Sequence, residues 1–240
     1  MTPLGRIAVI GNSLPRRCGI ATFTTDLQRA IVNSRPNLTT SIVAMTDRGQ
    51  AYDYPGSVVL QIRDDAVEAY VRAAALLNAG RFDIACLQHE FGIFGGEAGS
   101  HILELLSRLT MPVVTTLHTV LAEPTVAQHA VMDRIVEMSA KIIVMANKGR
   151  ELLRSVYRVP DEKIEVIAHG IPDFPFVESD TAKGQARVQR PLRHSDVRLV
   201  VPQQGHRGHD RCHAVDPGAV SGRGLRRARS NPPQSGSGSW

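Results

Sequence analysis

Seven short runs rich in Val, Ile and Ala recur along the first 170 residues and constrain the fold more than any other feature of the sequence. They are RIAVIG (6–11), TTSIVAM (39–45), SVVLQI (57–62), DIACLQ (83–88), MPVVTTLH (111–118), KIIVMA (141–146) and KIEVIAHG (163–170). Continuous apolar runs of this length are typical of strands in a parallel sheet that is covered on both faces.

Longer stretches with helical spacing of apolar residues separate most of these runs. The predicted helices are 19–34, 66–79, 98–109, 125–139 and 148–156. Strands that alternate with helices predict an α/β domain, with a Rossmann-like, doubly wound parallel sheet.

Charge and composition divide the chain near residue 180. The whole chain has a formal net charge of +5, yet residues 184–240 contain ten Arg, no Lys and three Asp, and no Ile, Met, Phe or Tyr. Such a segment buries too little apolar surface to offset its ordering entropy. With Pro172, Pro175 and the acidic VESD at 177–180 as a linker, we expect a folded domain over 1–180 and a basic, disordered tail over 181–240.

Cysteine usage and the absence of a long apolar run predict a cytoplasmic protein. The chain has three cysteines, Cys18, Cys86 and Cys212, and this small, odd number argues against a disulfide framework. No run approaches the roughly 18 apolar residues of a transmembrane helix, and residues 1–6 lead into the first strand without a signal-peptide core.

Three predicted loops that follow strands carry polar groups suited to ligand binding, and in open α/β sheets such loops form the binding crevice. The first, GNSLPRRCGIATFTTDL (11–27), brings Arg16 and Arg17 to a glycine at a helix start, a pattern that fits an anion site and a solvated basic loop equally well.

The second loop, LQHEFGIFGG (87–96), presents His89 and Glu90, and the third, TTLHTVLAEP (115–124), presents His118. These groups suit binding of sugar hydroxyls or proton transfer. The alternatives are a glycine-rich turn in which His89 and Glu90 cap the next helix, and a purely structural His118. Three such loops at one sheet edge favour a functional site.

Five segments together resemble the amino-terminal half of family 4 glycosyltransferases of the GT-B fold, over residues 5–180. They are PRRCGIATFTTDL (15–27), QHEFGIFGG (88–96), LHTVLAEP (117–124), VMANKGRELL (144–153) and IEVIAHGIPD (164–173). The resemblance implies transfer of a sugar, with retention, from a nucleotide-diphosphate-sugar to a carbohydrate or lipid-linked acceptor. It implies no obligatory metal and no cofactor other than the nucleotide-sugar co-substrate.

The resemblance also implies roles for individual residues. Gly19 and Arg17 would bind the donor diphosphate, and His118, the catalytic candidate, would contact the donor sugar near the reacting carbon. Arg16, His89 and Glu90 would line the acceptor side.

The tail departs from the family pattern, which requires a second, donor-binding domain with a basic pair and a Glu pair. One codon set for residues 201–211, read one base later, gives SPNKGIEVMI, which resembles the start of that domain. We therefore interpret the tail as a frameshifted remnant that begins near residues 183–186. The chain is then a truncated form with little or no transferase activity.

Two other interpretations of the tail are a zinc site and a nucleic-acid-binding segment. His206, His209, Cys212 and His213 are close enough in sequence for a zinc site, but no strand or helix pattern surrounds them, and we predict no metal site. The net charge of +7 over residues 184–240 favours only salt-sensitive, non-specific nucleic-acid binding.

Two alternatives to the transferase concern the folded domain. One is a non-catalytic α/β module that binds a saccharide or an anion and has a basic interaction tail. The other is a nucleotide-dependent epimerase, which would require a GxGxxG fingerprint after the first strand and an acidic residue that ends the second. The missing fingerprint weighs against the epimerase.

Overall fold

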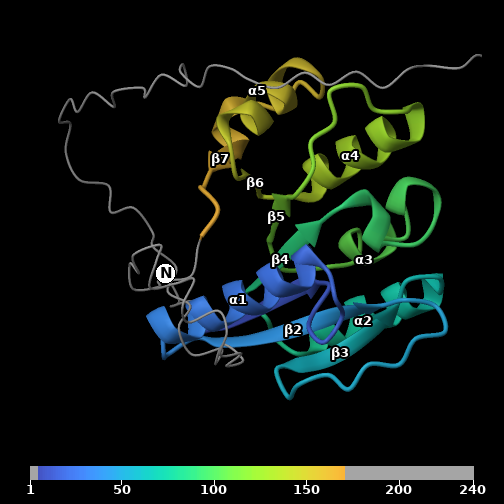
Figure 1. Cartoon of the computed structure of the whole chain (residues 1–240), viewed down its shortest axis with the longest axis vertical. Helices are drawn as coiled ribbons and strands as arrows, with labels where there is room; N and C mark the ends of the chain where they lie inside the picture. Colours follow the sequence, from blue (N-terminus) through green and yellow to red (C-terminus); the bar gives the residue numbers. More distant parts are fainter. Residues whose placement is uncertain (1–4, 171–240) are drawn as a thin grey trace, which may run out of the picture. The chain divides into compact units, whose positions relative to one another are not determined.

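The computed structural model describes residues 5–170, which form one seven-stranded parallel sheet with helices on both faces (Figure 1). The strands lie in the order β3-β2-β1-β4-β5-β6-β7. Their bounds are β1 (Arg6–Gly11), β2 (Thr39–Thr46), β3 (Val58–Arg63), β4 (Ile84–His89), β5 (Val113–Leu117), β6 (Lys141–Val144) and β7 (Ile164–Val166). Each strand overlaps one predicted run, and the Rossmann-like α/β class is confirmed.

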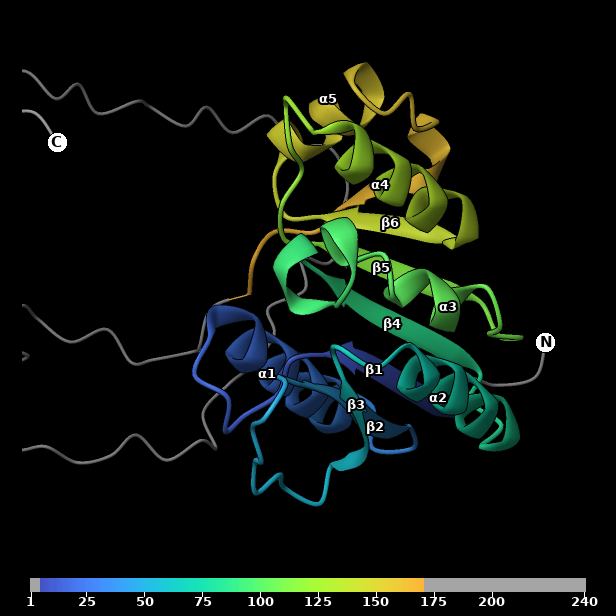
Figure 2. The same ribbon diagram turned by 90° about the vertical axis from the view of Figure 1, so that its right-hand side faces the viewer.

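The direction in which strands are added reverses between β1 and β4, and this reversal distributes the helices over the two faces. Right-handed crossovers place α1 on one face and α2, α3 and α4 on the other (Figure 2). The helix bounds are α1 (Gly19–Ser34), α2 (Val67–Ala79), α3 (Ile102–Leu106), α4 (Val126–Met138) and α5 (Asn147–Ser155). The reversal is the point at which open α/β sheets bind ligands.

Alternation along the strands builds the larger core. Side chains on one face of the central strands pack against α2, α3 and α4, and they include Ala8, Ile10, Val43, Met45, Ala85 and Leu87. Small residues of α2, such as Ala73 and Ala74, are fully buried and let this helix approach the sheet closely. A second cluster, which includes Ile142 of β6 and Leu153 of α5, continues the core toward β7.

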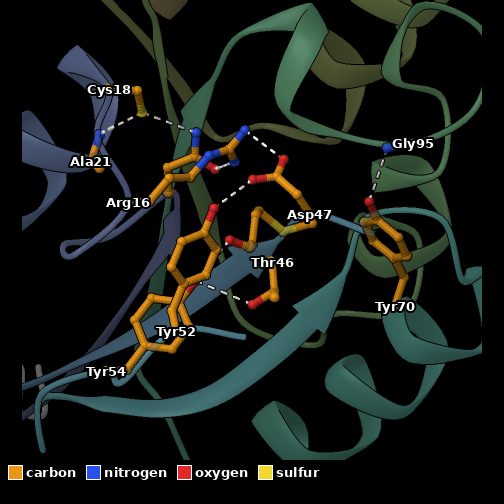
Figure 3. Close-up of polar contacts among 11 residues, drawn as sticks. Arg16, Cys18, Ala21, Thr46, Asp47, Tyr52, Tyr54, Tyr70 and Gly95 are labelled. Carbon is orange, nitrogen blue, oxygen red and sulfur yellow. Dashed lines mark hydrogen bonds and ion pairs between the residues drawn. The ribbon is translucent and has the colours of Figure 1, made fainter. Parts of the chain in front are cut away.

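The helix predicted over 98–109 is much shorter, because the chain turns sharply before it. Only 102–106 are α-helical, and Gly96, Ala98 and Gly99 have φ values of 81°, 52° and 77°. The amide of Gly95 donates to the Tyr70 hydroxyl at 3.1 Å (Figure 3), and that hydroxyl donates to the carbonyl of Asp64 at 3.1 Å. A tertiary contact therefore fixes this loop against the end of β3.

Several expectations lie outside the described residues. They are the boundary near residue 180, the tail over 181–240 with its proposed frameshift, and the His206–His213 cluster. Within residues 5–170, no helix is long and apolar enough to cross a bilayer.

The contact at Gly95 generates a stability prediction. A Cβ added to Gly95 would overlap the backbone carbonyl of Asp64 and lie 2.6 Å from Nδ1 of His101, whereas no atom lies within 4 Å of a Cβ added to Gly92 in the same loop. We expect Gly95→Ala to lower the free energy of unfolding by about 1–3 kcal/mol. Chemical denaturation measures this loss, and an equal loss in the control Gly92→Ala would contradict the assigned packing.

Candidate functional site

The loops after β1, β4 and β5 meet at the carboxyl edge of the sheet, as expected for parallel strands. The amide of His118 donates to the carbonyl of His89 at 3.0 Å, and the hydroxyl of Thr119 donates to Oε2 of Glu90. The ring of Phe23, near the start of α1, meets the imidazole of His118 edge-on, with centroids 4.9 Å apart. Three of the predicted site loops are thus in direct contact.

The amino-terminal end of α1 has the features of an anion site. Cys18 is the N-cap residue, and its Sγ accepts from the amide of Ala21 and from Nδ2 of Asn12, both at 3.3 Å (Figure 3). Gly19 opens the helix, is exposed, and has no neighbour in the described part of the chain within 4 Å of the position a Cβ would take. Free N–H groups and the helix dipole favour a negative charge here.

The two arginines of the first loop have different surroundings. Arg16 donates to Oδ1 of Asn12 at 2.5 Å and pairs with Oδ1 of Asp47 at 2.7 Å, so it ties the loop after β1 to the end of β2 (Figure 3). Arg17 is exposed and lies two residues before Gly19, the first residue of α1. Arg16 therefore has a structural role in this conformation, and its predicted acceptor contact stays a prediction.

Asp47 bears on the epimerase alternative, because it is an acidic residue directly after β2. Its Oδ1 pairs with Arg16, and its Oδ2 accepts from the hydroxyl of Tyr52 at 3.0 Å. Both carboxylate oxygens already have partners within the chain, whereas dinucleotide-binding Rossmann domains use this carboxylate for a ribose hydroxyl. The arrangement disfavours that alternative.

His118 lies at the end of β5, half-buried, and is held by Gln88 of β4. Its Nε2 is 3.0 Å from Oε1 of Gln88, which assigns the proton to Nε2 and leaves Nδ1 as an acceptor. Burial lowers the pKa of His118, the carboxylate of Glu90 raises it in part, and His169 lowers it again. Because its ordinary pKa is about 6.5, the imidazole is neutral at neutral pH.

Several buried polar atoms at this edge have no hydrogen-bond partner among the described residues. They include both ring nitrogens of His89, Nε2 of Gln88, and Oγ1 of Thr24, which belongs to α1. Gly11 permits the approach of Gln88 and Thr24, since a Cβ there would lie 2.9 Å from Cβ of Gln88 and 3.3 Å from Oγ1 of Thr24. The absence of a side chain at the end of β1 therefore brings α1 close to Gln88.

His89 and Glu90 differ sharply in exposure. His89 is fully buried between the rings of Phe91 and Phe94, and burial lowers its pKa to about 3. Glu90 is half-buried, and its Oε1 accepts from the amide of Phe91 at 3.1 Å. The capping alternative is thus observed for Glu90, and the acceptor-side roles of both residues stay predictions.

A pocket of about 210 Å³ opens beside His118, between the end of β5 and the start of α5. Its lining is Leu117, His118, Val120, Val144, Met145, Ala146, Lys148, Gly149 and Leu152. Sequence reasoning assigned no site residue to α5. The only signal was the VMANKGRELL segment. Its glycine, Gly149, lets α5 lie close to Val144, since a Cβ added to Gly149 would be 3.0 Å from Cβ of Val144.

No group of three or more His, Cys, Asp or Glu side chains in metal-binding arrangement occurs within residues 5–170.

Comparison with known proteins supplies the family. The model of Glycosyltransferase Family 4 matches residues 19–173, which is more than half of the chain. No curated protein sequence matches.

Solved structures share the fold. A glycosyltransferase from Rickettsia africae ESF-5 superposes with a TM-score of 0.51 at 14% identity, covering 77% of this chain and 49% of that one. The apo form of the lipopolysaccharide outer core galactosyltransferase WaaB superposes with a TM-score of 0.50 at 10% identity, covering 70% and 46%. The chain therefore spans about half the length of these enzymes. Together with the arrangement of its loops, the family match shows that the chain belongs to Glycosyltransferase Family 4.

Proposed function

We propose that residues 5–170 form the acceptor-side wall of an enzyme that transfers a sugar, with retention, from a nucleotide-diphosphate-sugar to a carbohydrate or lipid-linked acceptor. The observation that carries the proposal is the position of the half-buried His118, held by Gln88 at 3.0 Å and packed against Phe23 of α1. A neutral hydrogen-bonding group for a sugar thus lies at the same edge as an anion site.

The donor diphosphate would approach the amino-terminal end of α1. The open space at Gly19 lets phosphate oxygens reach the backbone N–H groups, and Arg17 adds a cation at the surface. When the bond between the anomeric carbon and the diphosphate oxygen breaks, negative charge builds on the leaving group. Fixed dipoles and a cation stabilise that charge.

His118 would orient the donor sugar. Its Nδ1 has no proton in the assigned tautomer and can accept a hydrogen bond from a sugar hydroxyl. The anomeric carbon then bonds to the acceptor oxygen as its bond to the diphosphate oxygen breaks, and the proton of the acceptor hydroxyl passes to the departing diphosphate. The 210 Å³ pocket beside His118 gives a group of the substrate room next to the reacting carbon.

Transfer also needs groups on the donor side of the cleft, since GT-B enzymes act by closing two walls around the substrates. We therefore expect the 240-residue chain to release nucleoside diphosphate from nucleotide-sugars far more slowly than the roughly 1–1,000 s⁻¹ that is typical of enzymes. A coupled assay over several donors and acceptors measures this rate, and turnover within that range would contradict the one-wall proposal.

A non-catalytic module that binds a saccharide or an anion remains the second candidate, favoured by the same anion site. This candidate predicts ligand binding without turnover, even in a protein whose gene has been corrected for the frameshift that we propose near residues 183–186. Product formation by the restored protein, with retention shown by the anomeric NMR signals, distinguishes the transferase.

The space at Gly19 generates a sharp test of the diphosphate site. Gly19→Ala adds a methyl group that touches no atom of residues 5–170, so the free energy of unfolding should stay unchanged or rise by up to about 1 kcal/mol. The same methyl group blocks close approach of phosphate, and we expect affinity for UDP and GDP to fall about tenfold, measured by calorimetry.

Gly56→Ala is the matched control, because Gly56 lies in another loop and likewise has no described residue within 4 Å of an added Cβ. Equal affinities of Gly19→Ala and Gly56→Ala would remove Gly19 from the site.

Arg17 generates a second binding prediction, and an exposed arginine at the other end of α1 provides its control. Arg17→Ala should weaken UDP or GDP binding about three- to tenfold, with the difference shrinking at high salt. Arg35 follows the carboxyl end of the same helix and is also exposed, and Arg35→Ala should leave binding unchanged. Equal losses in the two variants would mean that only the net charge of the chain matters.

A further inference from the structure

Three aromatic rings from distant parts of the chain meet beside the candidate site. The ring of Phe23 lies edge-on to His118, at 4.9 Å and 88°, and also edge-on to His169, at 5.1 Å and 68°. One phenyl ring thus contacts two imidazoles. Edge-to-face packing of this kind orients aromatic rings as well as burying them.

The contact with His169 depends on the path of the chain after β7. The amide of Ile167 still donates to the carbonyl of Val144 at 2.9 Å, so the segment leaves the sheet beside β6. Residues 168–170 then run back toward the amino-terminal end of α1, as both ribbon views show (Figures 1 and 2). The contact between His169 and Phe23 is therefore a tertiary contact between residues that are far apart in the sequence.

His169 is itself oriented by a local hydrogen bond. Its Nδ1 is 2.8 Å from the carbonyl of Gly170, which assigns the proton to Nδ1. Its side chain is exposed, in contrast to the half-buried His118. An exposed imidazole that packs on Phe23 has no core to fill, which points away from a purely structural role.

We propose that His169 is a positioning residue of the candidate site, acting on His118 through the ring of Phe23. The segment that leaves β7 then helps to set the orientation of the imidazole that would contact the donor sugar. The contacts among the three rings are observed. Only their consequence for sugar transfer rests on the proposed function.

The mechanism of this effect is a three-point support for the His118 ring. Gln88 fixes Nε2, the backbone of β5 fixes Cβ, and Phe23 limits rotation of the ring about the Cβ–Cγ bond. His169 packs against the same Phe23 ring. Without His169, Phe23 gains freedom to turn, and the His118 ring with it.

Charge couples the two histidines as well. The charged or titratable groups around His118 are Glu90 on the loop after β4, His89 beneath it, Lys148 across the pocket, and His169. Glu90 raises the pKa of His118, whereas burial and His169 lower it. Removal of the His169 imidazole should therefore raise the pKa of His118.

The test is an NMR titration of the histidine rings in the 240-residue chain, with long-range ¹H–¹⁵N spectra to report the tautomers. Wild-type His118 should show the Nε2–H tautomer. In His169→Ala, its pKa should rise, and its two nitrogen shifts should move toward the average of the tautomers.

Two further variants separate packing from charge. His169→Gln keeps a polar side chain without the imidazole charge, so it should raise the pKa as His169→Ala does. Phe23→Leu keeps an apolar group but removes the edge-on ring, and should average the His118 tautomers. His129→Ala, at a half-buried histidine of α4 that packs on Tyr157, is the control and should change neither property of His118.

An unchanged His118 tautomer and pKa in both His169→Ala and Phe23→Leu would overturn the inference, even if nucleotide-sugars bind. Conversely, failure of every nucleotide-sugar to bind would contradict the proposed function and leave the coupling of the rings intact. Because His169 is exposed, unfolding of His169→Ala would show a core role and would also overturn the inference.

Discussion

The parallel sheet reverses its strand order between β1 and β4, and the candidate site depends on this constraint. Parallel strands bring all their carboxyl ends to one edge, so loops from distant parts of the chain must meet there. Gly11 then allows α1 to lie close to Gln88, and Gln88 holds His118. The candidate site thus depends on the topology of the sheet and on the glycine at position 11.

The surroundings of the polar residues separate those that hold the site together from those free to bind ligands. Arg16 is committed to Asn12 and Asp47, and Glu90 to the amide of Phe91 and to Thr119. Their removal would loosen the loops before it changed any ligand contact. Gly19 and Arg17 face solvent at the start of α1, where a phosphate can reach them.

Sequence patterns predicted the strands and the sheet class well, because hydrophobic periodicity records burial of each strand directly. They predicted α1 to the residue, since an apolar period and a start glycine coincide there. They failed for the helix after Gly96, where Ala98 takes a positive φ and the preceding Gly95 packs against Asp64, just after β3. They also missed the burial of His89, the Arg16–Asp47 pair and the approach of His169, all of which depend on tertiary contacts.

Binding of a nucleotide-sugar at the carboxyl edge is the central claim, and chemical-shift mapping tests it most directly. The 240-residue chain, labelled with ¹⁵N, is titrated with UDP- and GDP-sugars while backbone amides and histidine rings are followed. The account predicts shifts concentrated at Arg17, Gly19, the first turn of α1 and the ring of His118. Shifts confined to the opposite edge of the sheet, or no shifts with any nucleotide-sugar at millimolar concentration, would contradict it.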